Sequence, residues 1–213
     1  MTVTLLVLAG VVALVDWCAA DRRLFRLEYL VKPLTLALLL AAAATGDLGD
    51  AKPYVIVALA LGLVGDVAIM LADPRGANRL FFAGLVSFLL GHAAYVAGFV
   101  TVGVHLLPLL AGLLVAAGVG GLILPAVMAR ISGAGLTIAV GGYSLAVGAM
   151  ATFAAGTQLL LVAVGGALFV VSDGVLARER FADPLPRGEL TVAVTYHLAQ
   201  FLIVIGLLVH ATQ

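Results

Sequence analysis

Long apolar runs alternate with short polar connections along the whole chain. A hydrocarbon core about 30 Å thick requires about 20 apolar residues per helix, and fewer where a helix is buried among others. Eight runs fit this rule, at residues 2–20, 31–45, 54–72, 80–101, 106–128, 134–155, 158–177 and 190–210. Regular two-residue alternation is absent, so helices are the spanning structure that fits. We predict an all-α membrane protein in which residues 1–213 form a single bundle of eight transmembrane helices.

The composition agrees with a membrane location. The chain is 64% hydrophobic and 10% charged, and its mean hydropathy is +1.24. Eleven basic and eleven acidic residues give no net charge, so no overall basic surface favours nucleic acid. No basic residue precedes the first run, and Trp17 beside Cys18 does not fit a lipoprotein-type cleavage site, so we expect a retained helix. We expect an integral multi-pass protein, in a bacterial cytoplasmic membrane.

Positive charges predict the orientation of the bundle. Ten of the eleven lysines and arginines lie in or beside the odd-numbered connections, and only Lys52 lies elsewhere. These ten are Arg22, Arg23, Arg26, Lys32, Arg75, Arg79, Arg130, Arg178, Arg180 and Arg187. Because basic loops stay in the cytoplasm, the odd-numbered connections are predicted to be cytoplasmic and both termini to lie on the outer side.

Several polar residues lie inside the predicted spans. An ionisable group at mid-membrane costs at least about 2.5–3.5 kcal/mol on insertion scales, so it normally faces the bundle interior and serves a function. The rise of a helix places Asp66, Asp173 and Tyr196 about 8–12 Å from the cytoplasmic boundary, and His92 deeper, at about 19 Å. Spacings of three or four residues place others on shared helix faces, so that they could line one cavity. These others are Tyr95, three residues from His92, and His197 and Gln200 in the last span, whereas Tyr143 and Ser172 are further polar residues of the sixth and seventh spans.

Each polar residue also has a purely structural interpretation. Buried Tyr95, Tyr143, Ser172 and Gln200 could simply hydrogen-bond and join helices. The two aspartates differ, because we expect no lysine or arginine partner within the membrane, which favours a functional role. Asp16, at a helix end beside Trp17, is interpreted as an interfacial anchor.

Lys32 and Pro33 are expected to open the second helix at the cytoplasmic boundary, since proline suits a first helical turn. Two roles for Lys32 remain open at this stage. Its side chain could extend to the membrane surface, or it could contact a lipid phosphate at the mouth of a cavity.

Metal and serine-nucleophile chemistry have little support in the pattern. A catalytic zinc requires three ligands, usually including closely spaced histidines, and His92 and His197 stand on different predicted helices. No Gly-x-Ser-x-Gly segment occurs, so a serine nucleophile of that type is not expected. We expect no metal and no cofactor. The similar segments "LVGDVAI" and "VVSDGVL" are compatible with a parallel four-plus-four repeat.

Five short motifs occur in order along most of the chain: "KPLT" at 32–35, "GD" at 65–66, "SFLLGH" at 87–92, "SD" at 172–173 and "YHLAQFLI" at 196–203. Together they resemble the YhhN family of multi-pass membrane proteins, which includes the mammalian lysoplasmalogenases. The resemblance implies eight helices and hydrolysis of the vinyl ether of lysoplasmalogen to a fatty aldehyde and a glycerophospho-alcohol. His197 stands where the family more commonly has an aromatic residue, so a catalytic role for it is not expected.

The implied chemistry suits the aspartates. Vinyl ethers hydrolyse through protonation at carbon and an oxocarbenium ion, which requires an acid and an anion, and glycosidases handle a similar cation with two carboxyl groups. We therefore predict Asp66 and Asp173 as catalytic residues, with the two roles unassigned. The predicted substrate-binding residues are Lys32, His92, Tyr95, Tyr143, Ser172, Tyr196 and Gln200. The expected partners are a lysophospholipid substrate and membrane lipids.

Two other functions are compatible with the sequence. A small-solute or proton-coupled transporter would use buried aspartates as a relay. A structural or lipid-binding protein would leave the aspartates without a purpose. Because the polar residues gather in the cytoplasmic half, we favour a cavity open to one side, and hence the hydrolase.

Overall fold

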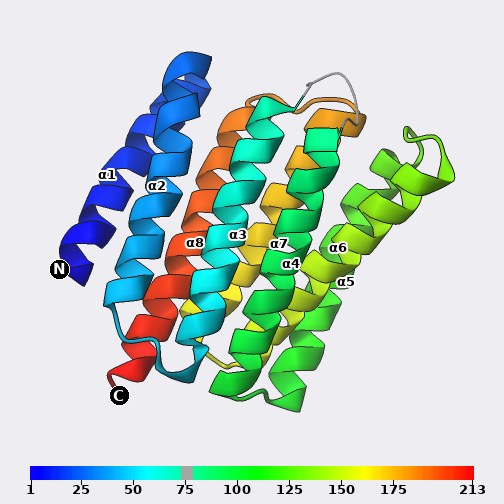
Figure 1. Cartoon of the computed structure of the whole chain (residues 1–213). Helices are drawn as coiled ribbons and strands as arrows, with labels where there is room; N and C mark the ends of the chain where they lie inside the picture. The colour runs from blue at the N-terminus through cyan, green and yellow to red at the C-terminus, as the bar shows by residue number, and fades with distance from the viewer. Residues whose placement is uncertain (73–78) are drawn as a thin grey trace.

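The computed structural model describes residues 1–72 and 79–213, and within them the chain forms a bundle of eight long α-helices (Figure 1). Each helix is long and apolar enough to cross a membrane, which confirms the predicted fold class. The helices are α1 (Thr2–Asp21), α2 (Phe25–Thr45), α3 (Lys52–Leu71), α4 (Arg79–Val102), α5 (Leu106–Met128), α6 (Ala134–Gly156), α7 (Leu160–Phe181) and α8 (Gly188–Ala211), with a short 3₁₀ turn, η1 (Gly49–Ala51), before α3.

Most helices extend beyond the apolar runs that predict them, because a helix can continue into water after its apolar stretch ends. The largest difference is at α2, which begins at Phe25, six residues before the predicted start. Pro33 therefore lies inside the helix, and the expectation that it occupies the first turn is wrong. A proline inside a helix removes one backbone hydrogen bond, and neighbouring helices commonly compensate for this in membrane proteins.

Both chain ends lie at the same end of the bundle (Figure 1). The hydroxyl of Thr2 at the start of α1 lies 3.1 Å from that of Thr45 at the end of α2. Gly46 in turn lies against Leu208, near the end of α8. The predicted outward sidedness of this end stays a prediction, and Arg75, one of the residues on which it depends, falls outside the described residues.

Two helix pairs, α3 with α4 and α7 with α8, form the tightly packed centre. Small residues allow the close approach of their backbones. A Cβ atom added to Gly65 on α3 would lie 2.7 Å from the Phe88 ring on α4, and one added to Gly165 on α7 would lie 2.8 Å from the Ala199 carbonyl oxygen on α8. In addition, α2 packs against α8 and α4 packs against α6, which are equivalent contacts in a parallel repeat of four helices. The contacts of α1 with α8 and of α5 with α7 have no counterpart of similar extent among the described residues, so the repeat stays a prediction.

The α5–α6 hairpin lies at one side of this centre and leans away from it toward the end where α5 meets α6 (Figure 1). Few residues of α5 are buried: only Gly112, Ala116 and Val127. The fold thus combines a tightly packed four-helix centre with a loosely packed hairpin beside it.

Candidate functional site

Asp66 lies on α3 and its side chain is only 5% exposed. The Tyr196 hydroxyl on α8 donates a hydrogen bond of 2.9 Å to Asp66 Oδ2. The Lys32 ammonium on α2 lies 3.9 Å from Asp66 Oδ1. Gly62, one turn earlier on α3, leaves room for this contact, since an added Cβ would lie 3.4 Å from the Tyr196 hydroxyl. We call Asp66, Tyr196 and Lys32 the α3 cluster.

The α3 cluster corrects two expectations. Lys32 is a basic partner of Asp66 within the membrane, although we expected no such partner. Its ammonium is also 5.9 Å from the centre of the Tyr196 ring, and its side chain is only 15% exposed. Contact with a lipid phosphate stays a prediction, and extension to the membrane surface does not describe this position. The reason is that α2 starts early, so Lys32 lies two turns inside the helix, with its side chain toward the bundle.

Asp173 lies on α7 and has different partners. The Tyr143 hydroxyl on α6 donates a hydrogen bond of 2.8 Å to Asp173 Oδ2. His92 Nε2 on α4 lies 3.7 Å from the same oxygen. His92 Nδ1 is 2.6 Å from the Phe88 carbonyl oxygen, which can only accept, so Nδ1 carries the proton and Nε2 of the neutral ring carries a lone pair. We call Asp173, Tyr143 and His92 the α7 cluster.

His92 and Asp173 are in contact, although the position of His92 along its helix predicts a deeper Cα atom. Helical side chains lean toward the N-terminus of their own helix. The first residue of α4 and the last residue of α7 lie at the same end of the bundle, so the two helices run in opposite directions (Figure 1). The side chains of His92 and Asp173 therefore lean toward each other, which closes the difference in depth of their Cα atoms.

Phe169 joins the two clusters. Its ring is 5.1 Å from the His92 ring and 5.6 Å from the Tyr196 ring, both in edge-to-face geometry. Each aspartate is thus contacted from the other half of the chain: Asp66 by Tyr196, and Asp173 by His92. Phe169 was not among the predicted residues, although its position one turn before Asp173, on the same helix face, could have indicated it.

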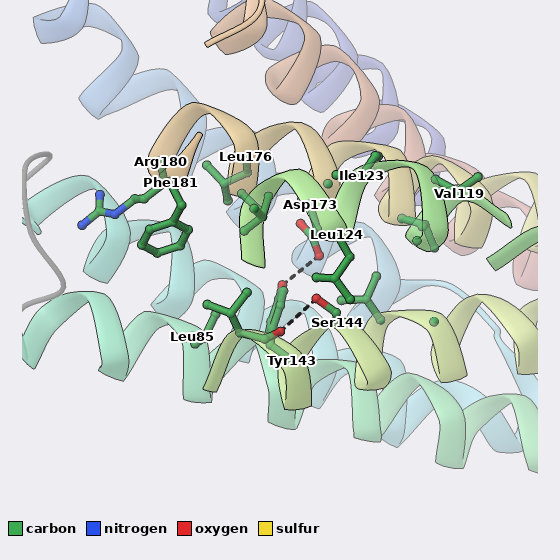
Figure 2. A pocket seen from close by; sticks show the side chains of 18 of the residues that line it. Leu85, Val119, Ile123, Leu124, Tyr143, Ser144, Asp173, Leu176, Arg180 and Phe181 are labelled. Carbon is green, nitrogen blue, oxygen red and sulfur yellow. Dashed lines mark hydrogen bonds between the residues drawn. The ribbon is translucent and has the colours of Figure 1, made fainter. Parts of the chain in front are cut away.

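A cavity of about 100 Å³ lies between the α5–α6 hairpin and α7, and residues of α4 and the end of α3 complete its walls (Figure 2). Of the nine predicted site residues, Asp173 and Tyr143 line it. Its walls are otherwise mostly apolar, and Arg180 and Phe181 lie at one end of the view in Figure 2. The predicted polar residues therefore do not all line this cavity, and Asp66 lies outside the lining.

Three other predicted residues hold helices together. The Ser172 hydroxyl donates a hydrogen bond of 3.3 Å to the Val192 carbonyl oxygen on α8. The Tyr95 hydroxyl on α4 donates to the Gln200 side-chain oxygen on α8. All three are buried, and these contacts match the structural interpretation given for them above.

Asp16 on α1 is fully buried, so its interpretation as an interfacial anchor is wrong. Its Oδ2 lies 3.8 Å from His197 Nδ1 on α8. The same nitrogen accepts a hydrogen bond of 3.2 Å from Trp17 Nε1. The predicted apolar run 2–20 already contained Asp16. Its rotation toward α8 could not be predicted from the sequence, because it depends on how the helices pack. Among the described residues, no cluster of three or more histidine, cysteine or acidic side chains is suited to a metal ion.

Comparisons with known proteins support the resemblance. The YhhN family model matches residues 27–207. The chain belongs to the YhhN family. The match includes α2 to α8 and both clusters, whereas α1, with Asp16 and Trp17, lies before it.

Several relatives of this YhhN protein have names. It is 32% identical to human lysoplasmalogenase TMEM86A and 30% identical to the bovine protein, each over 162 residues, which is 71% of this chain and 64% of the relative. It is 50% identical to human lysoplasmalogenase TMEM86B over 44 residues, 21% of this chain and 20% of the relative. The match therefore spans less than two thirds of these relatives' own length. No solved structure gives a significant match.

Proposed function

We propose that this protein hydrolyses the vinyl ether bond of lysoplasmalogen-type lysophospholipids within the membrane. The products are a fatty aldehyde and a glycerophospho-alcohol. The names of the TMEM86 relatives and the shared family support this substrate. The observation that carries the proposal is the pair of aspartates inside the bundle, Asp66 buried and Asp173 partly buried, which sit in adjacent clusters with unequal partners.

The difference between the partners of the two aspartates suits the reaction. Asp66 has an ammonium and a phenol as partners, which both favour its charged form. Asp173 has a phenol and a neutral imidazole, and no lysine or arginine is within ion-pair distance of it among the described residues. One carboxyl can therefore hold a proton while the other stays ionised, the division of roles found in other enzymes that act through carboxyl pairs.

The steps balance without a cofactor. A carboxyl proton moves to the β-carbon of the vinyl ether, and the ether oxygen then shares the positive charge as an oxocarbenium ion. Water adds to the charged carbon and returns a proton to the carboxylate, which gives a hemiacetal. The hemiacetal transfers its hydroxyl proton to the glycerol oxygen as the carbon–oxygen bond breaks. The net reaction adds one water molecule and releases aldehyde and alcohol.

The experiment is an aldehyde assay on purified protein in detergent or vesicles, with a 1-alkenyl lysophospholipid as substrate. The matched saturated 1-alkyl lysophospholipid has no double bond to protonate and is expected to release nothing. In deuterated water, each aldehyde should gain one deuterium on the carbon next to the carbonyl, where the vinyl ether takes its proton. If correctly folded protein releases no aldehyde from the 1-alkenyl lysophospholipid, the proposed function is wrong.

A further inference from the structure

We propose that the cavity between α5, α6 and α7 is the binding site for the substrate's ether-linked chain, and that Asp173 is the carboxyl group that touches the reacting atoms. Asp66 then acts from outside the cavity as a positioning residue. Arg180 binds the phosphate of the same lysolipid. This inference rests on the proposed function for the identity of the substrate, and it assigns the roles of the two aspartates.

The lining of the cavity suits an apolar ligand. Its walls are mainly leucine, isoleucine, valine, alanine and glycine side chains, with few polar groups. An apolar site with a small number of convergent polar groups is typical of a binding site for an apolar ligand. Asp173 is 13% exposed, whereas Asp66 is 5% exposed and lies outside the lining. A ligand in the cavity therefore meets Asp173.

Two glycines on α5 distinguish the side of the helix that faces the cavity from the side that faces outward. Gly120 lines the cavity, and a Cβ atom added there meets no atom within 4 Å. Gly118 is equally open but stands outside the lining, on the exposed surface of α5. A volume of about 100 Å³ holds about three water-sized groups. The cavity thus accommodates the vinyl ether and the first carbons, and the rest of the chain lies in the bilayer.

The spacing along α7 supplies the phosphate partner. Arg180 follows Asp173 by seven residues, which is two helical turns or about 10 Å, so both lie on the same face and both line the cavity. The Arg180 guanidinium packs 4.4 Å from the centre of the Phe81 ring. Arg180 also makes further interactions within the protein, and a phosphate would share its five N–H donors with them.

The order of groups matches a lysophospholipid in the predicted cytoplasmic leaflet. Arg180 is one residue before the end of α7, near the predicted cytoplasmic boundary of the membrane, and Asp173 lies two turns further into the span. In the lipid, the phosphate lies at the boundary, and the glycerol backbone separates it from the vinyl ether. Phosphate at Arg180 therefore places the ether near Asp173, with the chain extending toward Gly120 and Gly148.

With the vinyl ether at Asp173, each proton transfer of the reaction can be assigned to a residue. Protonated Asp173 transfers its proton to the β-carbon, and its carboxylate takes a proton back from the attacking water. The lone pair of His92 Nε2, 3.7 Å from Asp173 Oδ2, can hold that proton in between. Asp66, paired with Lys32, keeps its charge throughout and does not contact the lipid.

Matched variants test the chain site. Gly120→Leu should raise KM for the 1-alkenyl lysophospholipid by about tenfold or more, since it fills apolar binding space, while Gly118→Leu should leave KM within about twofold. As a smaller change, Gly120→Cys in a Cys18→Ala background should be protected from a maleimide by the saturated 1-alkyl lysophospholipid, and Gly118→Cys should not. Equal effects at the two glycines would overturn the site.

A second pair of measurements tests Arg180. Charge-assisted hydrogen bonds contribute about 1.5–3 kcal/mol, so Arg180→Gln should raise KM for the lysophospholipid by about ten- to a hundredfold. It should leave KM for 1-alkenylglycerol, which lacks the phosphate, unchanged, and Arg180→Lys should restore part of the loss. A similar loss on both substrates would show that Arg180 is only structural.

Measurements on the wild-type protein and on the variants distinguish a failure of the proposed function from a failure of the proposed binding site. If wild-type protein releases no aldehyde, the function fails, and binding of the saturated 1-alkyl lysophospholipid to the same variants still tests the site. If wild-type protein releases aldehyde while Gly120→Leu and Arg180→Gln bind and turn over normally, the function stands and the site is wrong.

Discussion

His92 Nε2 lies 3.7 Å from Asp173 Oδ2, although the two residues stand on helices from different halves of the chain. The Phe88 carbonyl fixes the opposite ring nitrogen as the one that carries the proton. The nitrogen that faces Asp173 is therefore a proton acceptor, placed beside the carboxyl group that lines the cavity.

His92→Phe keeps an aromatic ring for the contacts with Phe169 and Tyr143 but removes this acceptor. We expect kcat for aldehyde release to fall by about 10²–10⁴-fold, the usual contribution of general acid–base catalysis. His105→Phe, at an exposed histidine before α5, is the control and should retain the rate. Similar rates for both variants would remove His92 from the mechanism.

Tyr143 and Tyr95 provide a matched comparison, because the hydroxyl of each donates a hydrogen bond to a side-chain oxygen on a neighbouring helix. Tyr143→Phe removes a hydrogen bond to Asp173 at the cavity, and it should lower kcat/KM by about ten- to a hundredfold, as expected for about 1.5–3 kcal/mol. Tyr95→Phe removes a hydrogen bond to Gln200, and neither residue lines the cavity. It should lower the thermal unfolding midpoint and leave turnover within about twofold. The reverse pattern would place the reaction nearer to Gln200.

The ion pair between Lys32 and Asp66 should appear in stability measurements. Lys32→Met leaves a buried carboxylate without its cation, and we expect a loss below the about 3–5 kcal/mol of a fully buried pair, because Lys32 is partly exposed and the separation is long. Thermal unfolding in detergent provides the measurement. Adding Asp66→Asn to Lys32→Met should recover part of the stability. An additive further loss would show that the two residues are not coupled.

The helices and the polar residues could be predicted from the sequence, whereas most contacts between them could not. Apolar length fixes where a membrane helix must exist, so the eight helices agree with the expectation. It fixes neither the rotation nor the vertical offset of a helix. Lys32 and Asp16 were misplaced for that reason: each turns inward through packing that involves α8, far away in the sequence.

The α7 cluster shows the same limit. The residues Asp173, Tyr143 and His92 were all identified from the sequence, and their partnership was not. His92 appeared too deep to reach Asp173 when depth was counted in residues, because that count ignores the lean of side chains along antiparallel helices. Arg180 could have been found, since a spacing of seven residues from Asp173 places both on one face.

His197 is the contrast to His92. It faces Asp16 and Trp17 on α1, outside the part of the chain that the family model matches, and it does not line the cavity. His197→Phe should therefore retain aldehyde release within a few-fold. It should lower stability by about 1–3 kcal/mol, since the Trp17 N–H loses its acceptor. A loss of activity as large as that of His92→Phe, with unchanged stability, would contradict this assignment.

The aspartates decide the account. Asparagine keeps the volume and hydrogen-bonding capacity of aspartate but can neither donate a carboxyl proton nor carry a negative charge. If the carboxyl groups served only as hydrogen-bonding groups, the amides would substitute at a cost near that of a typical membrane hydrogen bond, about 0.6 kcal/mol.

The most direct measurement is the rate of aldehyde release from a 1-alkenyl lysophospholipid by purified Asp66→Asn and Asp173→Asn proteins. Both should elute as folded protein on size exclusion. We predict a fall of at least about 10²-fold for each variant, with the larger fall for Asp173→Asn, because that carboxyl transfers the proton. Near-normal release by both variants would contradict hydrolysis by the aspartate pair.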